Sequence, residues 1–148
     1  MLFLSKFNAS VDKKCRVSVP ASFRSVVAED SFAGVVIFPS TDGKHIVGCS
    51  MKRMEEISTA SEQQVGIFST QADSIQQQLF AQARPLAFDV NGRILLPLDI
   101  VQRFRLDDSL IFVGLGKFFH IWNENQYEKY TRQQKKTALP TIKIQSER

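Results

Sequence analysis

The sequence predicts a mainly β protein with helices, built from two copies of one structural unit. Three observations predict this fold class. The chain has 148 residues, which suits one compact domain or two very small ones. Its composition, 43% hydrophobic and 23% charged, is that of an ordinary globular protein. The pattern Asp-x-x-x-Arg, followed by apolar, any, apolar and Pro, begins at Asp12 and again at Asp89, an offset of 77.

The similarity between the two halves continues downstream of this pattern. The matching segments are apolar runs at 35–38 and 110–113, Gly-Lys pairs at 43–44 and 116–117, and stretches at 54–57 and 127–130. The last pair has an offset of 73, so the connection in the first copy is about four residues longer. We therefore expect each half to contain a strand, a turn, a second strand ending at Pro, a short helix, a hairpin and a closing helix.

The residues at the turns and strand ends support this order. Asn91 and Gly92 are typical of a tight turn, because both tolerate positive φ. Cys15 stands at the place of Gly92 in the first copy, so we expect that turn to be strained or differently shaped. Pro20 and Pro97 lack a backbone N–H and suit the start of a helix. Short helices are expected over 21–28 and 98–105.

The segment between the copies, residues 51–83, predicts a helical linker. Its apolar residues are spaced by 3, 4, 3 and 4, which places them on one helix face: Val65, Phe68, Ala72, Ile75 and Leu79. A paired helical linker is expected, with breaks near Ser58–Ser61 and before Pro85. Residues 131–136 continue the last helix before Pro140, and disorder is expected beyond that proline.

The distribution of charge limits what the basic composition implies. The chain has a formal charge of +4, but residues 129–148 contain six basic residues against the single acid Glu147. That segment alone carries +5, so residues 1–128 sum to −1. A phosphate-binding site must therefore arise from a local cluster of Arg and Lys made by the fold.

Several classes of protein are not expected. The N-terminus lacks the basic leader and apolar core of a signal peptide, and the longest apolar stretch, 110–116, is too short to span a bilayer. Cys15, Cys49, His45 and His120 are isolated, so we expect no disulfide framework, metal site or cofactor. No nucleophile motif or carboxylate pair indicates an enzyme, although residues that meet only in space leave that alternative open. No small-molecule substrate is expected.

Two further features are interpreted as structural. Phe118, Phe119 and Trp122 resemble a base-stacking platform, but their alternation within a strand favours core packing. The fragment 114–116 lacks the rest of a phosphate-loop pattern and is interpreted as a turn.

An Arg just past a tight turn projects from the start of a strand, where its planar fork can grip phosphate or the O6 and N7 of guanine. Asp12 and Asp89 can orient Arg16 and Arg93 or cap the turns. The alternative is a purely structural role, in which these pairs are salt bridges that stabilise a hairpin. A structural role and a role in DNA binding can also hold at once. Lys13 and Lys14 would add phosphate contacts.

The two copies of the Asp-x-x-x-Arg pattern, the helical segment that separates them and the segment 113–122 resemble the MraZ family of bacterial transcriptional regulators, and the resemblance covers nearly the whole chain. It implies a tandem AbrB-like swapped-hairpin β-barrel in which the two halves pair within one chain. It also implies a cytoplasmic, nucleoid-associated, ring-shaped homo-oligomer. Such a ring would bind double-stranded DNA at direct repeats upstream of its own division and cell-wall operon, usually as a repressor.

The predicted DNA-binding residues are Arg16, Arg93, Lys14, Lys13, Arg24 and Arg103, and the predicted orienting residues are Asp12, Asp89, Gly92, Pro20 and Pro97. Two positions depart from the family pattern. Cys15 replaces the expected Gly, and Val101 stands where many members have a basic residue. Half-site symmetry is therefore expected to be imperfect.

The predicted divisions of the chain are a first DNA-binding repeat over 7–54, a helical linker over 55–82, a second repeat over 83–127, and a basic helix end and flexible tail over 128–148. An alternative function is a protein-binding module, as in antidote proteins of AbrB-like fold that hold a toxin with a flexible tail. Those antidotes carry one copy and an acidic tail, whereas this chain carries two copies and a basic tail.

Overall fold

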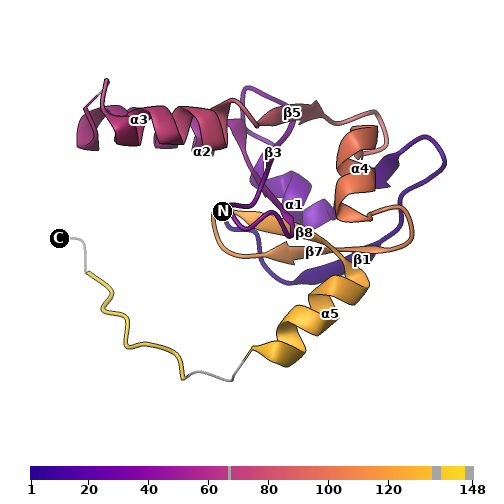
Figure 1. Ribbon diagram of the computed structural model, residues 1–148. Helices are drawn as coiled ribbons and strands as arrows, with labels where there is room; N and C mark the ends of the chain where they lie inside the picture. The colour runs from indigo at the N-terminus through magenta and orange to yellow at the C-terminus, as the bar shows by residue number, and fades with distance from the viewer. Residues whose placement is uncertain (67, 135–137, 146–148) are drawn as a thin grey trace.

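The computed structural model describes residues 1–66, 68–134 and 138–145. Its elements follow the order expected for two copies of one unit (Figure 1). The first half contains β1 (Lys6–Ala9), β2 (Arg16–Ser18), α1 (Ala21–Val26), β3 (Gly34–Pro39), β4 (Ile46–Cys49) and α2 (Met51–Gln64). The second contains β5 (Arg84–Ala87), β6 (Arg93–Leu95), α4 (Leu98–Phe104), β7 (Leu110–Gly114), β8 (Phe119–Asn123) and α5 (Glu124–Gln133). Between the halves lie α3 (Thr70–Ile75) and the π-helical turn η1 (Gln76–Phe80).

The two halves are joined by strand pairing. Six strands form one antiparallel sheet in the order β1-β7-β8-β4-β3-β5, and β2 pairs with β6 in a separate two-stranded sheet. Strands β1, β3 and β4 of the first half pair with β7, β5 and β8 of the second. Neither half therefore completes a sheet without the other.

The register of these pairs reveals a local two-fold relationship. Val17 faces Ile94 at the middle of β2–β6, and these residues are equivalent at the offset of 77. Val47 faces His120 at the middle of β4–β8, and these residues are equivalent at the offset of 73. A pseudo-two-fold axis passes through both pairs, so the copies are related as subunits of a symmetric dimer would be.

The expected closed barrel is not formed. Among the described residues, the edge strands β1 and β5 do not pair with each other, so the six-stranded sheet stays open. The turns that follow β1 and β5 carry the chain out of this sheet into β2 and β6. Val17 and Ile94 then point inward from the β2–β6 sheet, and the open side is covered by side-chain packing instead of by backbone hydrogen bonds.

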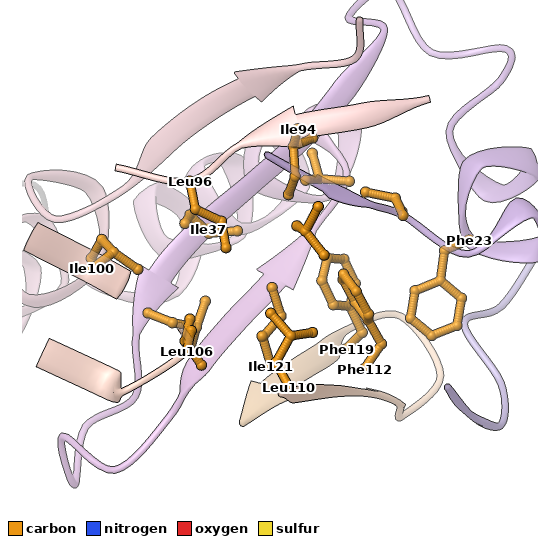
Figure 2. Packing of buried hydrophobic residues seen from close by; sticks show 14 of the residues in the cluster. Phe23, Ile37, Ile94, Leu96, Ile100, Leu106, Leu110, Phe112, Phe119 and Ile121 are labelled. Carbon is orange, nitrogen blue, oxygen red and sulfur yellow. The ribbon is translucent and has the colours of Figure 1, made fainter. Parts of the chain in front are cut away.

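The core lies between the six-stranded sheet, the β2–β6 sheet and the short helices α1 and α4 (Figure 2). Phe23 of α1 is fully buried and meets the rings of Phe3, Phe112 and Phe119 at centroid distances of 5.2–6.0 Å. Ile94 and Leu96 enter the same core from β6. Phe119 and Trp122 are buried as predicted, and Phe118 is half-buried beneath the guanidinium of Arg53.

The short helices form where the prolines predict them. Pro20 is the N-cap residue of α1 and Pro97 that of α4, each with φ near the value that the proline ring fixes. Arg105 is the C-cap residue of α4, and its φ of 53° places it in the left-handed region. The observed ends, Val26 and Phe104, are slightly earlier than the expected ends at 28 and 105.

The linker forms a pair of helices that extends away from the sheets (Figure 1). The predicted break near Ser58–Ser61 is wrong, because α2 runs unbroken to Gln64, and Ser61 Oγ donates to the Ser58 carbonyl within the helix. The chain turns instead after Val65, and Ser69 caps α3 by accepting from the backbone N–H of Ala72.

The expected apolar stripe is correct for only part of its length. Ala72 is buried on α3, and Ile75 and Leu79 are half-buried in α3 and η1. Val65 and Phe68 lie outside this helix, and Phe68 is fully exposed.

At the other end of the chain, Asn123 caps α5 by accepting from the backbone N–H of Gln126. Helix α5 ends at Gln133, so the predicted continuation over 131–136 holds for its first three residues, and 135–137 lie outside the described residues. Residues 138–145 are exposed and without regular structure, and the final residues, 146–148, are again outside the described part. None of the helices described is long and apolar enough to cross a membrane.

Candidate nucleic-acid interface

The first Asp-x-x-x-Arg segment is a turn organised by its aspartate. Asp12 Oδ1 accepts from the backbone N–H groups of Lys14 at 2.9 Å and Arg16 at 2.8 Å. Its Oδ2 accepts from Nε of Arg16 at 2.8 Å. Backbone bonds from Asp12 N–H to the Arg16 carbonyl and from Cys15 N–H to the Asp12 carbonyl close the turn. One carboxylate therefore fixes both the turn and the arginine beyond it.

The second segment repeats this arrangement bond for bond. Asp89 Oδ1 accepts from the backbone N–H groups of Asn91 at 2.8 Å and Arg93 at 3.0 Å, and Oδ2 accepts from Arg93 Nε at 2.9 Å. The closing backbone bonds run from Asp89 N–H to the Arg93 carbonyl and from Gly92 N–H to the Asp89 carbonyl. The spacing of the motif thus encodes a geometry, and both copies adopt it.

Both turns need a left-handed residue at the fourth position. Gly92 has a φ of 74° and Cys15 a φ of 63°. Of the two outcomes expected for the first turn, a strained turn of the same shape is the one observed. The left-handed region costs a residue with a Cβ roughly 1–2 kcal/mol. The hydrogen bonds of Asp12 hold Cys15 in this conformation.

The pairing of β2 with β6 brings the two arginines onto one surface, which we call the ribbon face. It consists of the outward side chains of this two-stranded sheet, Arg16, Ser18, Arg93 and Leu95. Arg16 faces Leu95 and Arg93 faces Ser18, so the arginines are diagonal neighbours roughly 7–8 Å apart. Residues 77 positions apart in sequence are thus presented side by side.

Each aspartate binds its arginine through Nε and leaves the Nη1 and Nη2 donors free. Only Nε of Arg16 and Arg93 is bonded to a carboxylate, and no described residue bonds to Nη1 or Nη2 of either. Each side chain is about a third exposed, at 33% and 28%. Each arginine therefore forms its salt bridge through Nε while its outer guanidinium edge stays free. A structural role in the hairpin does not exclude contact with a ligand.

The charges of the site follow from the same bonds. Backbone hydrogen bonds from Arg16 and Arg93 are the main cause that lowers the pKa values of Asp12 and Asp89 below the ordinary 3.8. Both aspartates are therefore ionised at neutral pH, and each Asp–Arg pair has no net charge. Attraction to an anion must come from other cations nearby.

Those cations differ between the two turns. Lys13 and Lys14 are exposed on the first turn, where the second has Val90 and Asn91. The second turn is covered by Arg24 of α1, whose guanidinium packs on Gly92: a Cβ at residue 92 would lie 2.7 Å from Arg24 Cζ. The sequence-predicted residues Lys13, Lys14, Arg16, Arg24 and Arg93 are thus all at or beside the β2–β6 sheet and its turns.

Arg103 is not part of this group. Its guanidinium lies over the ring of Phe104 at 4.9 Å and lines a separate groove beside α5 with Gly43 and Lys129. Sequence reasoning also missed Leu95, which is 60% exposed on the ribbon face. The alternation of Arg93, Ile94, Leu95 and Leu96 is the signal that could have found it.

The described residues contain no group of three or more His, Cys, Asp or Glu side chains that could hold a metal ion. The two cysteines are unpaired, and burial raises the pKa of the Cys49 thiol to about 12, so that this thiol is not a nucleophile at neutral pH. The ribbon face presents free arginine donors, and Lys13, Lys14 and Arg24 beside it supply positive charge, an arrangement that suits binding of an anion.

Comparison with known proteins gives a consistent result. A family model described as "MraZ protein, putative antitoxin-like" matches residues 79–144. Proteins named "Transcriptional regulator MraZ" from Rickettsia canadensis (strain McKiel) and Rickettsia bellii (strain OSU 85-389) are 36% and 35% identical to this chain. These alignments extend over 137 and 138 residues and cover 93% of this chain and 91% of each relative.

Proposed function

This chain belongs to the MraZ family, and from that premise we propose that it is a transcription regulator that binds double-stranded DNA in a sequence-specific manner through its ribbon face. The observation that carries the proposal is the placement of Arg16 and Arg93. Each is oriented through Nε by its own aspartate, and each keeps Nη1 and Nη2 for a ligand.

The shape of the ribbon face suits the major groove. That groove is about 12 Å wide and admits a two-stranded β-ribbon. A planar arginine edge presents two parallel donors, which match the O6 and N7 acceptors of guanine or two oxygens of a phosphate. Pre-orientation by Asp12 and Asp89 lowers the entropy that each arginine loses on binding. Leu95 adds an apolar contact of the kind that thymine methyl groups accept.

The lysines and Arg24 have a different role in this mechanism. Because the Asp–Arg pairs are neutral, electrostatic attraction to the duplex comes from Lys13, Lys14 and Arg24. Contacts of this kind fix position and orientation but carry no sequence information. Affinity and specificity are thus assigned to different residues.

The architecture that we propose for this function is the AbrB-like swapped hairpin. Its support is the pairing of β1 with β7 and of β3 with β5, which exchanges strands between the halves. We place the first DNA-binding repeat at 7–54, the helical linker at 55–82, the second repeat at 83–127 and the basic end at 128–148. The boundary at 54–55 falls within α2, so the first repeat and the linker share this helix.

We further propose that the protein acts in the cytoplasm, on the nucleoid, as a ring-shaped homo-oligomer that represses its own division and cell-wall operon from upstream direct repeats. One ribbon face makes few base contacts, so a single repeat is bound weakly. Several faces at fixed spacing raise the effective concentration of the second and later contacts. The relatives carry names of regulators, and the mechanism contains no catalytic step.

A second candidate function rests on the tail. Leu139, Ile142 and Ile144 are 93%, 76% and 92% exposed, which fits a segment that binds a protein partner, as in antidote proteins. Removal of residues 131–148 distinguishes the two functions. DNA binding by the ribbon face survives this truncation, whereas binding of a partner held by the tail is lost.

The proposal is tested by fluorescence anisotropy with duplex DNA from just upstream of the gene and with a scrambled duplex, across salt concentrations. Arg16→Ala/Arg93→Ala should abolish the preference for the native duplex. Arg84→Ala is the matched control, because Arg84 is also paired with an aspartate, Asp99 at 2.6 Å, but lies in β5, away from the ribbon face. Equal weak binding of both duplexes by wild type and double variant would overturn the proposal.

A further inference from the structure

A groove of about 290 Å³ beside α5 collects positive charge from three parts of the chain. Its cations are Lys44 from the β3–β4 turn, Arg103 and Arg105 from the end of α4, and Lys129 from α5. No aspartate or glutamate is among the described residues that line it. None of the four forms a salt bridge with a described residue, whereas Arg16, Arg53, Arg84 and Arg93 all do.

The backbone beneath these side chains is firmly held. Trp122 is 4% exposed and lies between the rings of His45 at 4.4 Å and Tyr130 at 4.9 Å. Asn123 Nδ2 donates to the carbonyl of Arg105 at 2.6 Å and so ties the end of α4 to the start of α5. The four cations are therefore kept near one another despite their mutual repulsion. Four donors without an acceptor among them favour an anion as the ligand.

The pseudo-two-fold axis provides an internal comparison. A groove of about 180 Å³ occupies the equivalent place in the first half and is lined by Met1, Phe3, Val26, Ser50, Lys52, Arg53, Glu56 and Lys117. Lys117 corresponds to Lys44, but Val26 stands in the place of Arg103. Glu56 stands in the place of Lys129 and pairs with Arg53 at 3.6 Å. Both grooves contain basic residues, but the first-half groove also contains the acid Glu56, which pairs with Arg53, whereas the groove beside α5 has four basic residues and no acid among its described lining residues.

The basic groove also adjoins a pocket beside the first turn. Arg105 lines both this groove and the pocket beside the first turn, which contains Asp12 and Lys13. Helix α4 connects the two places, and its seven residues span about 10 Å. Phosphates of one DNA strand recur about every 3.4 Å along the duplex axis, so this length corresponds to about three phosphates.

We propose that the groove formed by Lys44, Arg103, Arg105 and Lys129 is a second phosphate-binding surface, which holds the DNA backbone on one flank of the ribbon face and fixes the direction in which the duplex crosses the protein. This inference rests on the proposed function. The two arginines of the ribbon face are related by the pseudo-two-fold axis and by themselves accept a duplex in either direction. The difference in charge between the two grooves removes this ambiguity, and binding to direct repeats requires one direction for every subunit.

The test uses a duplex with one native repeat, extended by scrambled sequence on the left, on the right or on both sides. Wild type should bind more tightly when one particular side is extended and should gain little from the other. Lys44→Gln/Arg103→Gln/Lys129→Gln should lose that gain, and the slope of log K against log salt should become shallower by about two to three, at roughly 0.9 per phosphate contact. Lys52→Gln/Lys117→Gln, in the equivalent groove, is the matched control and should behave as wild type.

Equal gains from both flanks, or a triple variant with wild-type affinity and salt slope, would overturn the inference. If Arg16→Ala/Arg93→Ala still loses the preference for the native repeat, the proposed function stands while this inference fails. If wild type has no such preference, the proposed function itself fails. Sedimentation of the triple variant provides a further check: a changed oligomeric state would assign the groove to contacts between copies of the chain and would also overturn the inference.

Discussion

The guanidinium of Arg24 packs on the Cα of Gly92, a residue in the turn of the other half of the chain. At the equivalent place across the pseudo-two-fold axis, Val101 and Cys15 line one pocket. The absence of a side chain at residue 92 makes room for an arginine, and the presence of one at residue 15 coincides with a smaller, apolar neighbour. The two departures from exact repetition thus occur as a matched pair.

This relationship predicts that Gly92→Ala lowers the free energy of unfolding by about 1 kcal/mol or more, because alanine is strained at a φ of 74°. The new methyl group also displaces Arg24 from the turn. Gly116→Ala is the matched control, because Gly116 has a φ of 89° but no described atom lies within 4 Å of the place that the alanine methyl group would take. Urea unfolding should give similar losses for both variants, while only Gly92→Ala weakens DNA binding. Equal DNA binding by both would contradict a role for Arg24.

The order of the helices and strands was predictable because the same pattern of residues occurs in both halves of the chain. The Asp-x-x-x-Arg pattern, Pro20 and Pro97 each constrain a few neighbouring residues, and local constraints of this kind are visible in sequence. The open sheet was not predictable in the same way, because closure depends on whether β1 and β5 meet, and no residue in either strand encodes that. The break near Ser58–Ser61 failed because serine is tolerated within a helix when its hydroxyl bonds to a preceding carbonyl.

The candidate site, too, has features that the sequence predicts and features that it does not. The turn geometry of Asp12 and Asp89 follows from a local spacing, and the ribbon face follows from the two-fold pairing of the copies. Arg24 is equivalent to residue 101 at the offset of 77, only two positions before Arg103 in the second copy. The two arginines nevertheless make different contacts in the structure. Arg24 crosses to the other half because Gly92 leaves room, and Arg103 turns toward α5 and stacks on Phe104. Such choices depend on neighbours distant in sequence.

The two aspartates predict a defined dependence of stability on pH. Their pKa values in the folded protein lie below the ordinary 3.8, chiefly because backbone N–H groups of Arg16 and Arg93 donate to the carboxylates. A lowered pKa stabilises the folded state above about pH 3.8, and this contribution is lost as the pH falls through the folded-state value. Asp12→Asn/Asp89→Asn should therefore be less stable than wild type near neutral pH, and the difference should shrink below about pH 3.8. A difference that stays constant with pH would contradict this account.

His120 and His45 predict a second transition at higher pH. Their ring centroids lie 4.1 Å apart, and burial lowers the pKa of His45 and lowers that of His120 to about 4. Between about pH 6.5 and 4 the unfolded chain binds protons that the folded protein does not, so stability falls as the pH falls through this window. His120→Gln should flatten the fall, as measured by urea unfolding at several pH values. The carboxylate of Asp42, 3.8 Å from His45, favours the protonated histidine and so partly opposes the lowering of these pKa values by burial. If the slope of stability against pH were unchanged in His120→Gln, the assignment of this transition to His120 would be contradicted.

The ribbon face predicts that charge and geometry can be separated by replacing arginine with lysine. Arg16→Lys/Arg93→Lys keeps both positive charges but loses the planar fork that binds two acceptors at once. Binding to scrambled duplex should stay within about threefold of wild type, because phosphate attraction depends on charge. Preference for the native duplex should fall by at least about tenfold, since one bidentate contact to a base contributes roughly 1–3 kcal/mol of discrimination. Anisotropy titrations of both duplexes at one salt concentration measure the two quantities together. If the lysine variant keeps its preference while Arg16→Ala/Arg93→Ala loses it, the arginines act through charge alone, and sequence is read by other residues of the ribbon face.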